Sequence, residues 1–168
     1  MANTKNIDWD STAFFERLTA TNKLACDNQA KFCSVSGLDG FNECLGTLKS
    51  AKLIVAASDT SNGAFFMGDN TPHNDEVKLF FLAMRHKLDD MPARKKALDT
   101  LKELFRQFMT KLVQEKIRLE EHNLYLDDAI SFTEIDQYFF SGMACAYFQL
   151  KVTTYSDLRY NPDEWLEQ

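Results

Sequence analysis

The chain has 168 residues, of which 45% are hydrophobic and 26% charged, and its formal net charge is −6. This length is typical of one domain that buries a core of its own, and the apolar content excludes a disordered chain. The acidic balance argues against a duplex-binding protein, and no run of about 20 apolar residues predicts a membrane span.

The first sixty residues predict two helices and two strands. A helix is expected over 10–22, because Asp10 or Ser11 can cap it and Phe14, Phe15 and Leu18 then share one face. The other expected elements are a short strand at 31–36, a turn at 37–40, a short helix from Phe41, and a strand at 52–58. The last is a continuous apolar run, which is typical of a strand buried on both faces.

Residues 59–75 form a long polar stretch with Phe65, Phe66 and Met67 inside it. A loop of this length in a compact domain is usually functional, mobile, or hides a strand or hairpin. The three apolar residues are therefore either part of an edge strand or exposed anchors that dock on a neighbour. They are candidate interface residues, together with Trp165 near the C-terminus.

Residues 76–86 predict a central strand, because alternate side chains on both of its faces are apolar. A helix over 90–119 follows, capped by Asp89 or Asp90 and with Pro92 in its first turn. Its length suggests that its end could project beyond the sheet. The expected core stripe of this helix is Ala97, Leu98, Leu101, Leu104, Phe105, Phe108, Leu112 and Val113, extended by Ile117.

The remaining residues predict a hairpin and a tail. Residues 132–140 have strand-like composition and can pair with a long strand at 143–154, whereas 155–168 read as a C-terminal tail. The expected fold is thus α+β in a single domain over 1–168. It has one mixed, mostly antiparallel sheet of about four to five strands, packed by two main helices (10–22 and 90–119) and a short helix.

The sequence contains none of the common catalytic or phosphate-binding motifs, and its three histidines and four cysteines lack metal-like spacing. We therefore predict no catalytic, cofactor-binding or metal-binding residues, and a protein made in the cytosol. An enzyme would have to assemble its site from dispersed residues such as Cys145, His86 and Asp59. A cytosolic adaptor that binds another protein through aromatic residues is a further alternative.

The chain resembles the small α/β tail-completion and tail-terminator proteins of tailed phages, in particular prophage proteins of Bacteroidetes-type genomes. The segments that carry the resemblance are 14–18, 53–60, 90–94, 104–108, 142–152 and 160–165. The likeness spans most of the chain, although no signature motif defines such proteins.

This resemblance implies a non-enzymatic virion protein that forms a ring, commonly a hexamer, at the tail end or head–tail junction. Its partners would be copies of itself and neighbouring tail or neck proteins, and it would assemble in the host cytoplasm. Subunits of such a ring meet through head-to-tail contacts that close on themselves. The stretch 59–75, the end of the long helix and the tail after Thr154 are the expected contact elements.

Overall fold

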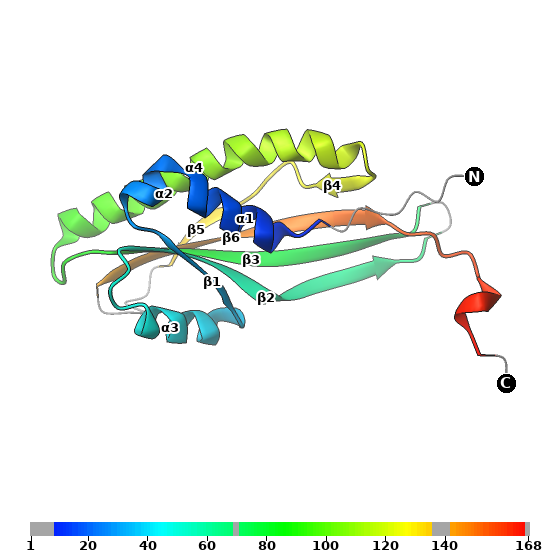
Figure 1. Cartoon of the computed structure of the whole chain (residues 1–168), viewed down its shortest axis with the longest axis horizontal. Coiled ribbons are helices and arrows are strands. Elements are labelled where there is room, and N and C mark those ends of the chain that lie inside the picture. Colours follow the sequence, from blue (N-terminus) through cyan, green and yellow to red (C-terminus); the bar gives the residue numbers. More distant parts are fainter. Residues whose placement is uncertain (1–8, 69–70, 136–141, 167–168) are drawn as a thin grey trace.

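The computed structural model describes residues 9–68, 71–135 and 142–166, which form one mixed sheet with helices on both faces (Figure 1). The helices are α1 (Ser11–Thr21), α2 (Lys23–Asp27), α3 (Gly37–Thr47) and α4 (Met91–Glu120), followed near the C-terminus by a 3₁₀ turn, η1 (Pro162–Glu164). The strands are β1 (Lys31–Val35), β2 (Leu53–Phe66), β3 (His73–Arg85), β4 (Leu124–Leu126), β5 (Phe132–Ile135) and β6 (Met143–Tyr155).

The sheet has six strands in the order β1-β2-β3-β6-β4, and β5 also pairs with β6. Only β1 and β2 are parallel, while all the other pairs are antiparallel. The expected α+β class and mostly antiparallel sheet are confirmed, but four to five strands was too few. The three-residue strand β4 and the short helix α2 were both missed, because neither is long enough to show a hydrophobic period.

Two hydrophobic cores lie on opposite faces of the sheet, as expected for a central strand that is apolar on both sides. Phe80 and Leu82 of β3 point into the core beneath α1 and α4. Phe81 and Ala83 point into the core above α3. β3 lies between β2 and β6 in the sheet. Because its side chains alternate between the two faces, it contributes to both cores.

The long helices begin where side-chain caps were expected. The Asp10 carboxylate accepts the N–H of Ala13 at 3.0 Å, and the Asp90 carboxylate accepts the N–H of Ala93 at 2.9 Å. Asp90 is therefore the cap of α4, while Asp89 has a φ of 58° and makes the turn before it. A short polar side chain at each cap satisfies one of the orphan N–H groups of the first helical turn.

The turn expected at residues 37–40 is wrong, because α3 already begins at Gly37. Gly37 has a φ of +65°, a conformation that glycine adopts without strain, and the N–H of Gly40 bonds to the carbonyl of Ser36 at 3.2 Å. Two glycines close together resemble a turn in sequence. Here they form the entry and first turn of a helix.

The core stripe of α4 was predicted incorrectly at its C-terminal end. Val113 and Ile117 are exposed, whereas Leu112 and Leu119 are buried. The end of the helix does not project either, because Leu119 packs in the same core as Leu124 and Leu126 of β4. The chain turns back after α4 and places β4 beneath the last turn of the helix (Figure 1).

The stretch 59–75 is a hairpin, which is one of the possibilities that its length suggested. β2 continues to Phe66 and β3 begins at His73, so most of the stretch lies in these two strands. The strand pairing shifts register between Ala57 and Ser61, where polar sequence replaces apolar sequence. Residues 136–140 of the predicted strand 132–140 lie outside the described residues, but β5 pairs with β6 as expected.

The sheet divides into two halves along its strands. The part of the sheet formed by residues 53–58 of β2 and the strand residues paired beside them is called the proximal sheet. Helices cover both of its faces. We call residues 59–66, 73–78 and 150–155, together with β4, the distal sheet. Figure 1 shows the distal sheet extending beyond α1 and α3. α4 still covers part of one of its faces, while no helix among the described residues covers the other, which we call the open face.

Candidate interaction surface

An aromatic row crosses the open face from one strand to the next. Phe66 stacks on His73 with ring centroids 4.5 Å apart, and His73 meets Tyr155 edge-on at 6.0 Å. Tyr155 in turn contacts Tyr125 edge-on at 5.4 Å. The row therefore joins β2, β3, β6 and β4. Exposed aromatic rings held in fixed geometry are the side chains that protein interfaces favour.

A polar cluster lies next to the aromatic row, in the neighbouring row of cross-strand pairs. Asp75 pairs with Thr153 across the two strands, and the Thr153 hydroxyl donates to the Asp75 carboxylate at 2.6 Å. The Lys151 ammonium lies 2.9 Å from the other oxygen of the same carboxylate and 3.9 Å from Asp127. These contacts tie β3 to β6 and fix the register of the distal sheet.

The charge of Asp75 is held by this cluster. Burial alone would raise the pKa of Asp75, but the hydrogen bonds from Thr153 and Lys151 oppose burial, and the net result is a pKa lowered from its ordinary value of 3.8. The same contact raises the pKa of Lys151, through its hydrogen bond to Asp75. The two groups therefore stay charged and paired near neutral pH, on a flat surface and not in a cleft.

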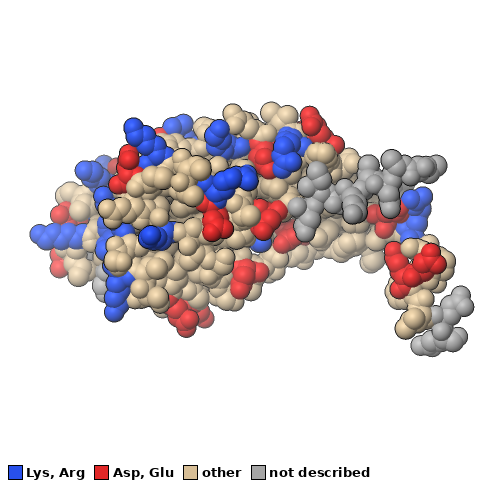
Figure 2. Space-filling view, in the orientation of Figure 1, with Lys and Arg blue, Asp and Glu red and all other residues tan. Residues whose placement is uncertain are grey.

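The outer edge of β2 is free in the distal sheet. β1 pairs with β2 only from Ile54 to Ser58, so among the described residues no strand lies outside residues 59–66. All eight residues of this segment are exposed. Residues 60–66 carry no charged side chain and no proline, and Figure 2 shows this part of the molecule as a mostly tan strip. An edge without Lys or Pro is open to pairing with another strand.

Two hollows of the described surface are mainly apolar. One of about 330 Å³ lies on the α3 side of the sheet and is lined by Leu79, Phe81 and Tyr147 among others. Another of about 420 Å³ lies between α4 and the segment from β4 to Ile130, with Lys116 and Asp128 at its rim forming an ion pair. Neither hollow brings together a nucleophile and a base, so both suit apolar contacts.

The structure separates the candidate interface residues. Phe66 belongs to the aromatic row, whereas Phe65 points to the opposite face because strand side chains alternate. Phe65 and Met67 are nonetheless exposed. Trp165 stacks on Tyr160 at 6.4 Å, in the C-terminal tail and away from the sheet. Sequence reasoning missed His73, Tyr125 and Tyr155, since only the strand register brings them beside Phe66.

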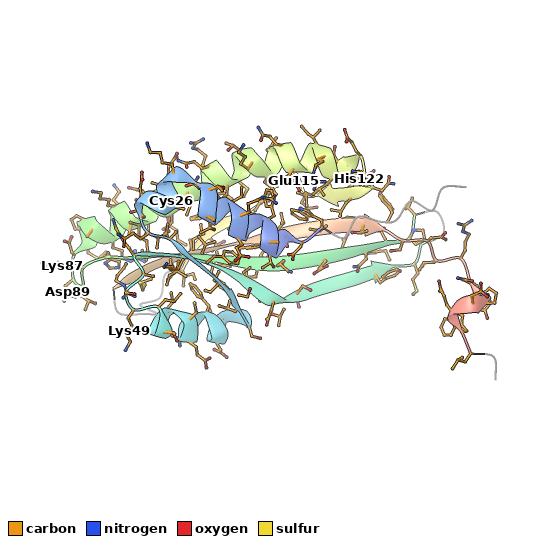
Figure 3. The ribbon with its side chains drawn as sticks, in the orientation of Figure 1. Cys26, Lys49, Lys87, Asp89, Glu115 and His122 are labelled. Atoms are coloured by element: carbon orange, nitrogen blue, oxygen red, sulfur yellow. The ribbon has the colours of Figure 1, made fainter. Side chains whose placement is uncertain are left out.

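The dispersed residues that could have formed an enzyme site do not come together. Cys145 pairs with Ala83, whose other neighbour is Ile54, whereas Asp59 lies five residues farther along β2. Burial raises the pKa of the Cys145 thiol to about 12, so it stays protonated. His86 lies three residues beyond Ala83, the strand partner of Cys145, and follows the end of β3. Figure 3 places its neighbour Lys87 at one end of α4.

Residues 9–68, 71–135 and 142–166 lack two further kinds of site. No three His, Cys, Asp or Glu side chains gather there as ligands for a metal ion. No helix in these residues is long and apolar enough to cross a bilayer. A comparison of the chain with known protein families finds no matching family, and one with curated proteins finds no matching relative.

Proposed function

We propose that the protein is a non-enzymatic structural component of a phage tail or tail-like particle. It assembles as a ring at the tail end or head–tail junction, in contact with copies of itself and with neighbouring tail or neck proteins. It would assemble in the host cytoplasm and remain in the virion. The resemblance in sequence supports the particle, and the distal sheet supports the assembly.

The observation that carries the proposal is the incomplete distal sheet. Its open face presents the aromatic row Phe66–His73–Tyr155–Tyr125, and its β2 edge has no strand beside it among the described residues. A sheet with one bare face and one bare edge exposes surface that another protein can cover. The face and the edge differ from each other, so contacts between copies can be head-to-tail, as a closed ring requires.

The polar cluster suits the same role. Asp75 is satisfied by Thr153 and Lys151, so a partner covering the open face would not bury an unpaired carboxylate. The aromatic row beside it supplies rigid apolar area at a small cost in side-chain entropy. The surface thus combines an apolar strip with a neutralised polar strip, which is the usual composition of a protein interface.

Size-exclusion chromatography with light scattering, run over a wide range of protein concentration, tests this proposal. We expect the mass to rise from 19.3 kDa to a closed multiple of it as the concentration increases. The double variant Phe66→Ser/Tyr155→Ser should shift this rise to higher concentration, while Val113→Ser on the exposed side of α4 should not. A mass of 19.3 kDa at every concentration would count against the ring and favour an adaptor that binds a different protein.

A further inference from the structure

The C-terminal tail, residues 156–166, is exposed from Asp157 onward. Leu158, Tyr160, Trp165 and Leu166 are all exposed, and Leu166 is 98% exposed. Figure 1 shows the tail leaving the end of β6 and standing away from the sheet and helices. Four large apolar side chains without cover are costly in water, so the tail is built to contact something outside its own fold.

The first part of the tail has the pattern of a strand. Residues 157–161 read Asp-Leu-Arg-Tyr-Asn, so Leu158 and Tyr160 alternate with charged residues. In an extended chain this period of two places Leu158 and Tyr160 on one face and Asp157 and Arg159 on the other. The Arg159 guanidinium already pairs with the Asp157 carboxylate, which neutralises the charged face.

We propose that residues 157–161 of one copy add as a β-strand to the free edge of β2 in a second copy. The acceptor is the edge at residues 61–66, which offers backbone N–H and C=O groups to an incoming strand. Each subunit then carries one donor and one acceptor, so the contact repeats head-to-tail from copy to copy. This inference deepens the proposed assembly function and relies on it for closure of the ring.

Donor and acceptor match in length and in their side chains. Five tail residues meet six edge residues, a normal length for a short strand. On the open face the edge presents Ala64 and Phe66, so Leu158 and Tyr160 of the neighbour can cover these two and continue the aromatic row. The small side chain of Ala64 leaves room on this face for a larger side chain of the donor.

The same contact cannot readily form within one chain. Tyr155 pairs with His73, and His73 pairs with Phe66, so the tail starts two strands away from β2. The N–H of Ser156 also bonds to the carbonyl of Pro72 at 3.0 Å, which holds the start of the tail beside the hairpin. Reaching the outer side of β2 means crossing about 14 Å, which uses roughly four or five residues at ~3.3 Å each.

Crossing within one chain would therefore consume the alternating segment itself. The part of the tail left to pair with β2 would begin at Asn161 and Pro162, which form the start of η1. Proline has no N–H to donate to a strand ladder. A strand from a second copy meets no such limit, since it can approach the edge of β2 directly. The donor is for this reason another copy of the chain.

Mixed disulfide trapping of full-length variants tests the inference. In a Cys26→Ser background, which removes the exposed native thiol, one variant carries Leu158→Cys or Tyr160→Cys and the other carries Ala64→Cys or Phe66→Cys. After mixing and mild oxidation we expect a disulfide between the two different variants in at least one combination, because paired strands hold Cα atoms within disulfide range. A tail variant mixed with Val113→Cys is the control for random collision. If no combination exceeds that control, or if a Tyr160→Cys/Phe66→Cys double variant links only within one chain, the inference is overturned.

A second measurement separates this inference from the proposed function. In the full-length chain, Leu158→Ser/Tyr160→Ser should raise the dissociation constant for self-assembly by tenfold or more. It should not change the thermal midpoint of the dilute, monomeric protein, because the tail packs on neither core. If the parent chain assembles and this variant assembles equally well, strand addition is wrong and the assembly function stands. If the parent chain stays monomeric at all concentrations, the proposed function itself fails.

Discussion

The proximal and distal halves of β2 belong to one strand but lie in opposite environments. Residues 53–57 are fully buried between α1 and α3, whereas residues 59–66 are all exposed. The composition changes at the same point, from Leu-Ile-Val-Ala-Ala to Asp-Thr-Ser-Asn-Gly-Ala-Phe-Phe. The proximal half completes a core within one chain, whereas our proposal has a partner complete the distal half. On that proposal, stability and assembly depend on different ends of the same strands.

The largest expected difference between the halves concerns two phenylalanines. Phe80 is fully buried, with its ring 4.4 Å from that of Phe15 and 5.1 Å from that of Phe148. Phe80→Ala should lower the free energy of unfolding by about 3–5 kcal/mol, because it leaves a cavity among these rings. Phe66→Ala should change it by less than about 0.5 kcal/mol. Urea denaturation of monomeric samples measures both, and equal losses would contradict the division into halves.

A second contrast lies at the distal end of α4, where one helical face is covered and the other is bare. Leu119→Ala should cost about 2–5 kcal/mol, since Leu119 is fully buried in the core shared with β4. Ile117→Ala, two residues earlier, should leave stability within about 0.5 kcal/mol because Ile117 is exposed. If both variants behave alike in thermal unfolding, the helix end is not held down on the sheet.

The polar cluster links the distal strands and should make their stability depend on pH. The folded state lowers the pKa of Asp75 below its ordinary 3.8, so its contribution is complete above that pH and is lost as pH falls toward the folded value. Asp75→Asn should cost about 1–2 kcal/mol at neutral pH through weakened hydrogen bonds. The same variant should show a smaller loss of stability in acid than the parent chain, and parallel pH profiles for the two would contradict this role.

The smallest effect is expected at the start of α4 in the proximal half. Asp90→Ala removes the side chain that accepts the N–H of Ala93 and should cost about 1 kcal/mol. Asp89→Gly is the matched control, because Asp89 has a φ of 58° and glycine tolerates that conformation without loss. Thermal unfolding would contradict the assignment of the cap if Asp89→Gly proved the more damaging change.

Sequence reasoning predicted the proximal half well for a physical reason. Buried strands and core-facing helices must repeat apolar residues at fixed periods, and capping residues such as Asp10 and Asp90 mark where helices begin. It was wrong at Val113 and Ile117, because the adjacent apolar residues Leu112 and Val113 left the buried face of the last helical turns undetermined.

The distal half gave weaker signals, for the opposite reason. Residues 59–64 have no core to contact, so they need no apolar alternation and resemble a loop in sequence. The aromatic row draws Phe66, His73, Tyr125 and Tyr155 from four strands, and nothing in their spacing shows that they meet. Only the register of the strands brings them together. An interaction surface of this kind emerges from tertiary pairing and carries no local motif.

Hydrogen exchange measured at two protein concentrations, one below and one above the onset of assembly, tests the central claim most directly. We predict that amides of residues 53–57 are protected at both concentrations, because the proximal sheet is complete in a single chain. The amides of residues 61–66 that face away from β3, together with those of residues 157–161, should exchange fast when dilute and become protected together when concentrated. If the mass increases while exchange at these two segments stays the same, the distal sheet is not the surface on which copies of this protein meet.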